Sequence, residues 1–447
     1  MTLGKGLGSI GHKDLFKIAI PIMIANVSTP LIGVVDTIII GRVPDPALIG
    51  SVAIASLIFT FIYWGFGFLR MGTAGLTSQA AGANDQEEIR ATLGRSALLA
   101  IIIGLALIAL QHPISELSFY LIHGSPRVEL LANEYFDIRI WSAPATLTNY
   151  VLIGWLIAIG KARHALALQL LLNVSNMLLD ILFVLGLNMG VKGVALGTLL
   201  SEYGAAGAGI VIVLMIQNRL AGAWDIKRIL AKQKMIKNLS VNADILVRSL
   251  ALIVVFTWFT ASSAAFGDTV LAANAVLLHF MTVSAYFLDG IAFATEKFIG
   301  ESVGKNSRRH FSDAAKLTTM WAGGVATVIS ISLLIYGPDI IDFITVDNSI
   351  RETAKEYVIF AALTPLIGVW CFQLDGIFIG ATATALMRNS MLVSTLLFFI
   401  TWKSLEDLGN LGLWIALLSH FFYRTLTMYL QLPKVIGAIT EYKVSRD

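Results

Sequence analysis

Two acidic residues, Asp36 and Asp180, interrupt long apolar stretches of the sequence, "PLIGVVDTIIIGR" and "NVSNMLLDILFVLG". A carboxylate in the bilayer interior is costly unless it is paired or faces a wet cavity, and acids at such positions often serve ions, protons or substrates. A capped or snorkelling acid near a helix end is the structural alternative. It applies more readily to Asp36 than to Asp180.

Polar residues accompany Asp180 at helical spacing. Asn173, Asn176 and Asp180 are spaced i, i+3 and i+7, so they share one face of a helix. Thr198, on the next apolar stretch, falls at a similar depth, and Glu202 lies one turn further along the same face. We expect these side chains to converge on one site with the acid of the first stretch.

The chemistry expected of such a site is cation exchange. Two coupled carboxyls titrate as a pair and can hold a proton near neutral pH, and amides and a hydroxyl can hydrogen-bond to either protonation state. Sodium is the alternative cation, although it usually requires more oxygen ligands than are apparent here. We expect no cofactor and no resident metal, because the chain has one cysteine, Cys371, and no His-Glu-x-x-His helix.

The stretch that carries Asp36 also carries Pro21 and Pro30, with Gly33 one turn after Pro30. Proline removes a helical hydrogen bond and weakens the helix at that turn. Our hypothesis is that protonation near Asp36 changes the bend of this helix. The alternative is that these residues set a fixed kink.

The second half of the chain has acids of its own, Asp289 and Asp375, in helical stretches. Arg248 and Arg424 could neutralise either acid as structural ion pairs. A second ion or substrate site is the alternative.

Three charged residues, Glu134, Asp137 and Arg139, lie close together at the outer end of one stretch. We interpret them mainly as charges at the membrane interface. Tyr135, which lies among them, is instead a candidate to face the site.

The elements that position these residues are membrane-spanning helices. Of the 447 residues, 56% are hydrophobic and 14% charged, whereas soluble domains carry roughly 25% charged residues. This composition excludes a disordered chain, a nucleic-acid-binding domain and a soluble enzyme. With about 20 apolar residues needed for each span, the sequence predicts an all-α polytopic membrane protein with twelve spans, at about 15–40, 47–69, 93–111, 130–159, 163–186, 191–216, 243–266, 269–296, 314–336, 353–380, 385–402 and 411–432.

The positions of Lys and Arg indicate the orientation of these spans. With both termini inside, 21 of the 32 basic residues fall in cytoplasmic segments and 6 in outer loops. This is the bias of the positive-inside rule. We expect a multi-pass protein of the plasma membrane, with both termini cytoplasmic, and a monomer.

The chain repeats itself at half its length. Because the offset covers six spans, the halves are parallel in topology and predict two pseudosymmetric six-helix lobes around a central cleft. The predicted lobes are 1–216 and 243–447, and a cytoplasmic linker, 217–242, joins them. Rocking of such lobes gives alternating access, whereas duplication without transport, or a channel, is the alternative. The matches, each at an offset of 222, are Gly82 with Gly304, Glu134-Tyr135 with Glu356-Tyr357, and Gly154 with Gly376.

Other function classes lack the residues they need. The sequence contains no Gly-rich phosphate loop ending in Lys and Ser or Thr, so the chain does not power transport with its own ATPase. It contains no nucleophile elbow, and its short loops leave little room for a catalytic cluster. An enzyme is therefore not indicated.

Several segments taken together resemble the multidrug and toxic compound extrusion (MATE) family, in its DinF-like branch. The resemblance covers nearly the whole chain. Its segments are "VSTPLIGVVDTIIIGR", "RMGTAGLTSQAAGA", "SAPATLTNYVLIGWL", "NMLLDILFVLGLNMGVKGVALGT" and "VWCFQLDGIFIGATATALMRNSM".

The resemblance implies secondary active export of cationic or amphiphilic compounds in exchange for H+ or Na+, in the bacterial inner membrane. It implies a proton site at Asp36, Asn176, Asp180 and Thr198, and bending of the first helix at Pro21. A lipid-linked oligosaccharide flippase of the same superfamily is the runner-up, and such a flippase would favour a cleft lined by several Arg.

One departure bears on the coupling ion. In the NorM-like branch an acid on the seventh helix helps to bind sodium, and the corresponding stretch here, 249–266, contains no acid. This departure favours protons. Asp375 resembles the tenth-helix acid of that branch, so a role for the second half of the chain stays open.

Overall fold

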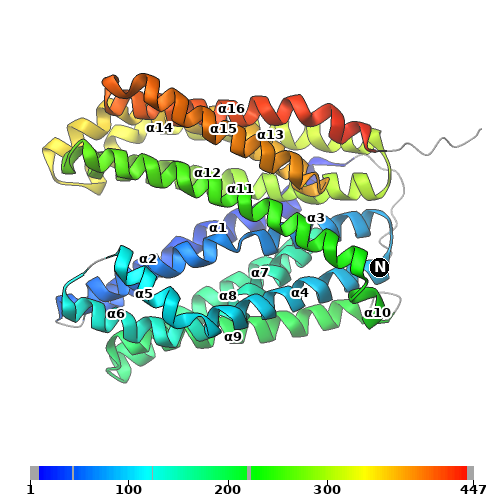
Figure 1. Cartoon of the computed structure of the whole chain (residues 1–447), viewed down its shortest axis with the longest axis horizontal. Coiled ribbons are helices and arrows are strands. Elements are labelled where there is room, and N and C mark those ends of the chain that lie inside the picture. The colour runs from blue at the N-terminus through cyan, green and yellow to red at the C-terminus, as the bar shows by residue number, and fades with distance from the viewer. Residues whose placement is uncertain (1–9, 43–44, 123, 219–222, 440–447) are drawn as a thin grey trace, which may run out of the picture. The chain divides into compact units, whose positions relative to one another are not determined.

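The computed structural model describes residues 10–42, 45–122, 124–218 and 223–439. Helices and turns make up this described part, without strands, which confirms the all-α fold (Figure 1). One turn of π-helix, Ile181–Gly186, follows α8, and 3₁₀ turns occupy Ile140–Ser142 and Glu406–Leu408. The α-helices are α1 (His12–Ile40), α2 (Pro46–Gly65), α3 (Phe68–Gly82), α4 (Gln86–Ala109), α5 (Gln111–Leu121), α6 (Pro126–Arg139), α7 (Ala143–Ala158), α8 (Ala162–Asp180), α9 (Gly190–Gln217), α10 (Ile226–Ile229), α11 (Lys232–Ala265), α12 (Asp268–Gly304), α13 (Arg308–Ile344), α14 (Asn348–Gly380), α15 (Thr384–Leu405) and α16 (Asn410–Gly437).

Ten segments of the described chain are long and apolar enough to cross a membrane. Two of them join consecutive helices, since α2 continues into α3 and α6 continues into α7. With α1, at 29 residues, and α16, at 28 residues, these segments match the twelve predicted spans. The sequence did not predict α5 and α10, which are 11 and 4 residues long.

The described residues fall into two compact units. The N-terminal unit consists of 24–42, 45–77, 85–122, 124–218 and 223–239, and the C-terminal unit of 10–23, 78–84 and 240–439. Three helices, α1, α3 and α11, therefore begin in one unit and end in the other. The predicted boundaries at 216 and 243 stay a prediction. The termini, 1–9 and 440–447, and residues 219–222 of the predicted linker lie outside the described residues.

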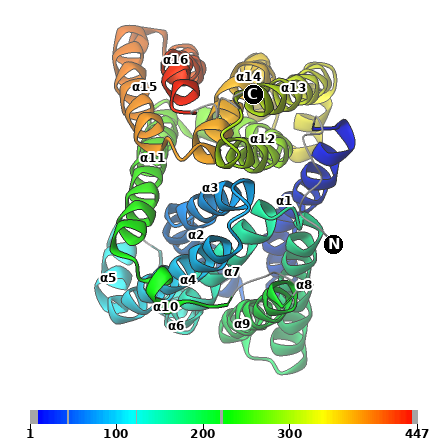
Figure 2. The same cartoon turned by 90° about the vertical axis from the view of Figure 1, so that its right-hand side faces the viewer.

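Helix α9 is the central element of the N-terminal unit. It packs against α6, α7 and α8, and α8 and α9 lie side by side in both views (Figures 1 and 2). In the C-terminal unit the corresponding place belongs to α14, which packs against α12, α13 and α16. Each central helix is thus positioned to present side chains to several neighbours.

The turns of the two halves repeat at the offset that the sequence predicts. Asn84 and Asn306, 222 residues apart, both adopt the left-handed conformation, with φ of 59° and 52°, which Asn tolerates better than most residues. The next residues, Asp85 and Ser307, are the N-caps of α4 and α13, and each accepts a hydrogen bond from the backbone amide three residues ahead.

Close helix crossings repeat in the same way. A Cβ on Gly154 would overlap the carbonyl oxygen of Arg70, and a Cβ on Gly376 would overlap that of Ala292. The glycines are 222 residues apart, and so are the residues that they contact. The pseudosymmetry of the two halves therefore extends to individual backbone contacts.

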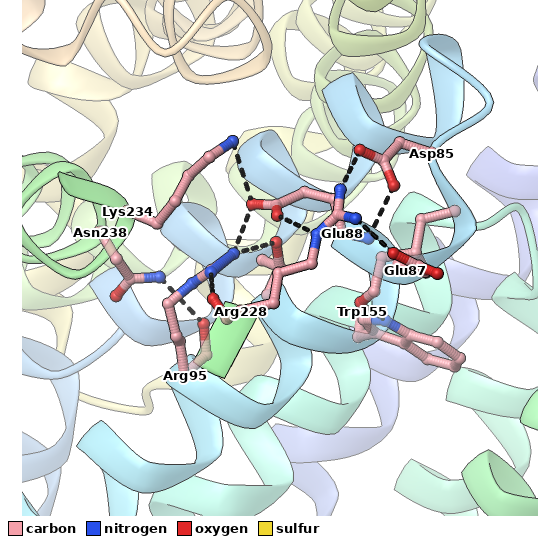
Figure 3. A network of polar contacts seen from close by, with 11 residues as sticks. Asp85, Glu87, Glu88, Arg95, Trp155, Arg228, Lys234 and Asn238 are labelled. Atoms are coloured by element: carbon pink, nitrogen blue, oxygen red, sulfur yellow. Dashed lines mark hydrogen bonds and ion pairs between the residues drawn. The ribbon is translucent and has the colours of Figure 1, made fainter. Parts of the chain in front are cut away.

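The segment between the halves is fastened to the N-terminal unit by ion pairs (Figure 3). Arg228, on α10, lies against three carboxylates at the start of α4, those of Asp85, Glu87 and Glu88. Arg95 pairs with Glu88 and also donates to the backbone carbonyl of Arg228 at 3.1 Å. Helix α11 then leaves this unit after Leu239.

Candidate cation-coupling site

The two carboxylates singled out in the sequence lie next to each other in the N-terminal unit. Asp36, on α1, is 8% exposed and Asp180, the last residue of α8, is completely buried. Their side chains are within hydrogen-bonding reach. No donor among the described residues satisfies Oδ1 of Asp36 or either oxygen of Asp180. Two carboxyl groups in such contact can bond only if one carries a proton, because an ionised carboxylate only accepts.

The end of α8 is shaped to hold Asp180. The helix passes directly into the π-helical turn Ile181–Gly186, and such turns occur frequently at functional sites. On α9, Gly197 faces the carboxylate, and a Cβ there would overlap Oδ1 of Asp180. The sequence analysis did not identify Gly197, since a glycine in an apolar helix gives no sign of what it contacts.

The amides predicted to share a face with Asp180 are buried and connect three helices. Asn173 donates to the hydroxyl of Ser28 on α1 at 2.8 Å, and Asn176 donates to the hydroxyl of Thr198 on α9 at 3.1 Å. The Thr198 hydroxyl donates in turn to a backbone carbonyl of its own helix. The side-chain oxygen of Asn176 is buried without a donor among the described residues. It adds a fourth unsatisfied oxygen to the three of the acid pair.

Glu202 is also buried, one turn beyond Thr198 on α9. Asn149, on α7, donates to its carboxylate at 2.8 Å and to its backbone carbonyl at 3.0 Å. Glu202 therefore has a dedicated amide donor, which the acid pair lacks. Asn149 lies in the segment "SAPATLTNYVLIGWL", but the sequence gave no reason to select it.

Arg139 corrects one interpretation made from the sequence. It was expected to be an interface charge, yet its Nε is buried and its Nη1 donates to the hydroxyl of Tyr135 at 3.3 Å. Tyr135 itself is 1% exposed. Because residues four apart share a helix face, the expectation that Tyr135 faces the site should have extended to Arg139.

The predicted hinge residues all lie within α1, which is continuous from His12 to Ile40. Pro21 is buried, whereas Pro30 and Gly33 are exposed. The boundary between the two compact units crosses α1 between Met23 and Ile24, one turn after Pro21.

The acids of the C-terminal unit are arranged differently. Asp375, on α14, accepts hydrogen bonds at Oδ2 from Arg248 and from Arg424, the latter at 2.7 Å. Both arginines thus meet on one acid, in the arrangement of the structural ion pairs left open above. Asp289 is half-buried on α12. Nearby, Lys297 pairs with Glu301 at 2.7 Å.

Comparison with known proteins identifies the family of this architecture. The MatE family model matches residues 21–182 and 245–401. The chain belongs to the MATE family. This match confirms the resemblance seen in the sequence, and the family consists of multidrug efflux transporters.

Individual relatives agree with this assignment. DNA damage-inducible protein F of Escherichia coli (strain K12) is 36% identical over 416 residues, covering 93% of this chain and 91% of that protein. Multidrug export protein MepA of Staphylococcus aureus (strain bovine RF122 / ET3-1) is 21% identical over 394 residues, covering 86% of each. A crystal structure of MATE in the bent conformation has a TM-score of 0.87 at 19% identity, covering 96% of both chains.

Membership of the MATE family places the chain among multi-pass membrane transporters of bacteria. Its relatives are transporters and not enzymes.

Proposed function

We propose that this chain exports cationic or amphiphilic compounds in exchange for protons, and that Asp36 and Asp180 share the coupling proton. The observation that carries the proposal is the contact between two buried carboxyl groups whose oxygens lack donors among the described residues. Like charges this close in a medium of low dielectric cannot both stay ionised without a cation. A proton satisfies this requirement with a single bond.

Exchange follows from the charge balance of the pair. With one proton bound, the pair carries one negative charge, and loss of that proton leaves two. A cationic substrate then compensates the charge that the proton compensated before, so the two compete for one negative charge. Competition of this kind couples export of a cation to entry of a proton by alternating access.

Bending of α1 is the proposed link between the pair and the transport cycle. Pro21 weakens the helix one turn before the point at which α1 passes from the C-terminal to the N-terminal unit. Asp36 lies beyond that point, so a change in its protonation acts on the segment that the proline makes deformable. Pro30 and Gly33 loosen the helix closer to the acid.

Sodium is the second candidate for the coupling ion. Four buried oxygens at the site lack a donor among the described residues: Oδ1 of Asp36, Oδ1 of Asn176 and both oxygens of Asp180. These oxygens could ligate Na+. A lipid-linked oligosaccharide flippase is less favoured, because the N-terminal unit gathers three acids around its site.

The remaining parts of the proposal concern the setting. We propose that the chain works as a monomer in the bacterial inner membrane with both termini in the cytoplasm, as the distribution of Lys and Arg indicates. No bound cofactor is required, because the coupling ion and the substrate are both transported species.

Transport in proteoliposomes tests this function. Ethidium movement would be followed by fluorescence under an imposed pH gradient, or under a sodium gradient at equal pH. We expect the pH gradient alone to drive transport by the wild-type protein. Asp36→Asn and Asp180→Asn should each reduce pH-driven transport to the level of empty vesicles.

Asp137→Asn is the matched control, because Asp137 is an exposed acid of the same unit. It should transport like the wild type. Transport driven by sodium and not by the pH gradient would contradict proton coupling. Normal pH-driven transport by both site variants would remove the acid pair from the mechanism.

A further inference from the structure

Arg139 is a cation held rigidly inside the N-terminal unit. Its guanidinium lies over the ring of Phe59, 5.2 Å from the centroid, and over that of Tyr135, 5.9 Å from the centroid. Cation–π contacts of this kind stabilise a charge that has lost water. The hydrogen bond from Nη1 to the Tyr135 hydroxyl fixes its orientation, and Nε is buried without an acceptor among the described residues.

The charged and titratable groups facing Arg139 come from every helix around it. Three are acids, Asp36 on α1, Asp180 on α8 and Glu202 on α9, and all three interact electrostatically with the guanidinium. The others are phenols: Tyr63 of α2, which shares a hydrogen bond with Ser142, Tyr135 of α6 and Tyr150 of α7. Arg139 is the basic group that these acids have in common.

Charge balance shows what this arginine does. With all three acids ionised, the site would carry three negative charges and one fixed positive charge. Arg139 compensates one of them permanently, and Glu202 keeps its amide donor, Asn149. The acid pair is then left with a single charge to exchange once it holds its proton.

We propose that Arg139 determines the ion specificity of the site, acting as a built-in cation that keeps sodium out while the acid pair still binds a proton. A fixed positive charge within several ångströms weakens binding of a second cation by on the order of tenfold or more at an effective dielectric constant of about 20. Sodium depends on electrostatic attraction and on ligands alone. A proton forms a covalent bond to one oxygen and tolerates the same repulsion.

The inference rests on the proposed function and concerns its coupling ion. Removing the positive charge makes the ionised acid pair less favourable, so protons are released only at higher pH. In Arg139→Gln the pH midpoint of ethidium transport should therefore move upward by about one unit, which corresponds to a tenfold change in proton binding. The same variant should gain transport driven by a sodium gradient.

Arg139→Lys preserves the charge and provides the conservative test. It should keep a pH midpoint near that of the wild type and stay insensitive to sodium. A structural role alone would lower the folded yield of both variants without moving the midpoint. Arg127→Gln is the matched control on the same helix, because Arg127 is exposed and pairs with Asp45 away from the site.

If Arg139→Gln does not fold, Tyr135→Phe provides the test. It removes the hydroxyl that orients the guanidinium and retains every charge, so we expect a smaller shift in the same direction. An unchanged midpoint and no sodium response in these variants would overturn the inference, as would sodium-driven transport by the wild type. Absence of pH-driven transport by the wild type would instead overturn the proposed function.

Discussion

The N-terminal and C-terminal units bury charge in opposite proportions. In the first, three acids, Asp36, Asp180 and Glu202, face one arginine, Arg139. In the second, one acid, Asp375, accepts hydrogen bonds from two arginines. The two halves share their turns and helix crossings, so the difference lies in the side chains and not in the backbone.

This contrast separates an exchange site from a structural one. An acid in excess over its donors needs a cation and can give it up. An acid with two guanidinium donors has no use for a further cation, since a sodium ion beside it would meet two fixed positive charges. We therefore assign ion exchange to the N-terminal unit and cohesion to Asp375 and its arginines.

The largest effect that tests the contrast is on stability. Asp375→Asn would leave two buried guanidinium groups without a counter-ion, and loss of one partner of a buried ion pair typically costs about 3–5 kcal/mol. Thermal unfolding in detergent should show this loss. Asp180→Asn, the matched change in the N-terminal unit, should cost less than about 1 kcal/mol, because it removes a charge from an acid-rich group. Equal destabilisation by the two variants would break the distinction.

Gly197→Ala tests the space that α9 leaves for Asp180. The added methyl group would overlap the carboxylate, and overpacking of this kind costs about 1–3 kcal/mol. Asp180 must rotate away from Asp36, so pH-driven ethidium transport should fall with the stability. Gly207→Ala, on the same helix, meets nothing within 4 Å of the new Cβ and should leave both measurements unchanged. Full transport by Gly197→Ala would show that the pair does not depend on this contact.

The smallest effect concerns the second donor to Asp375. Arg248→Gln leaves Arg424 in place and brings one acid opposite one arginine, so the loss should be about 1 kcal/mol, that of a single hydrogen bond. Unfolding curves of this variant should lie between those of the wild type and Asp375→Asn. A loss as large as that of Asp375→Asn would mean that the two arginines are not redundant.

Much of the site could be predicted from residue spacing. The i, i+3, i+7 pattern of Asn173, Asn176 and Asp180 defines a helix face without any tertiary information, and acids in apolar stretches are few enough to single out. Thr198 and Glu202 followed because the direction of each span fixes the depth of its residues. The twelve helices could be predicted from length and hydrophobicity for the same reason.

What the sequence could not supply depends on contacts between distant segments. Arg139 was misassigned because its position at the end of a stretch suggested an interface, and only the packing of α6 against α2 and α9 buries it. The role of Gly197 depends on the neighbouring carboxylate of α8. The convergence of Arg248 and Arg424 on one acid joins residues 127 and 49 positions from it in the chain.

The central claim is that a cationic substrate displaces the proton shared by Asp36 and Asp180. The most direct test is proton release on ethidium binding to purified protein in weakly buffered detergent solution, followed with a pH indicator. The wild type should release about one proton for each ethidium bound, and Asp36→Asn and Asp180→Asn should release none. Ethidium binding to the wild type without proton release, or equal release by all three proteins, would contradict the account.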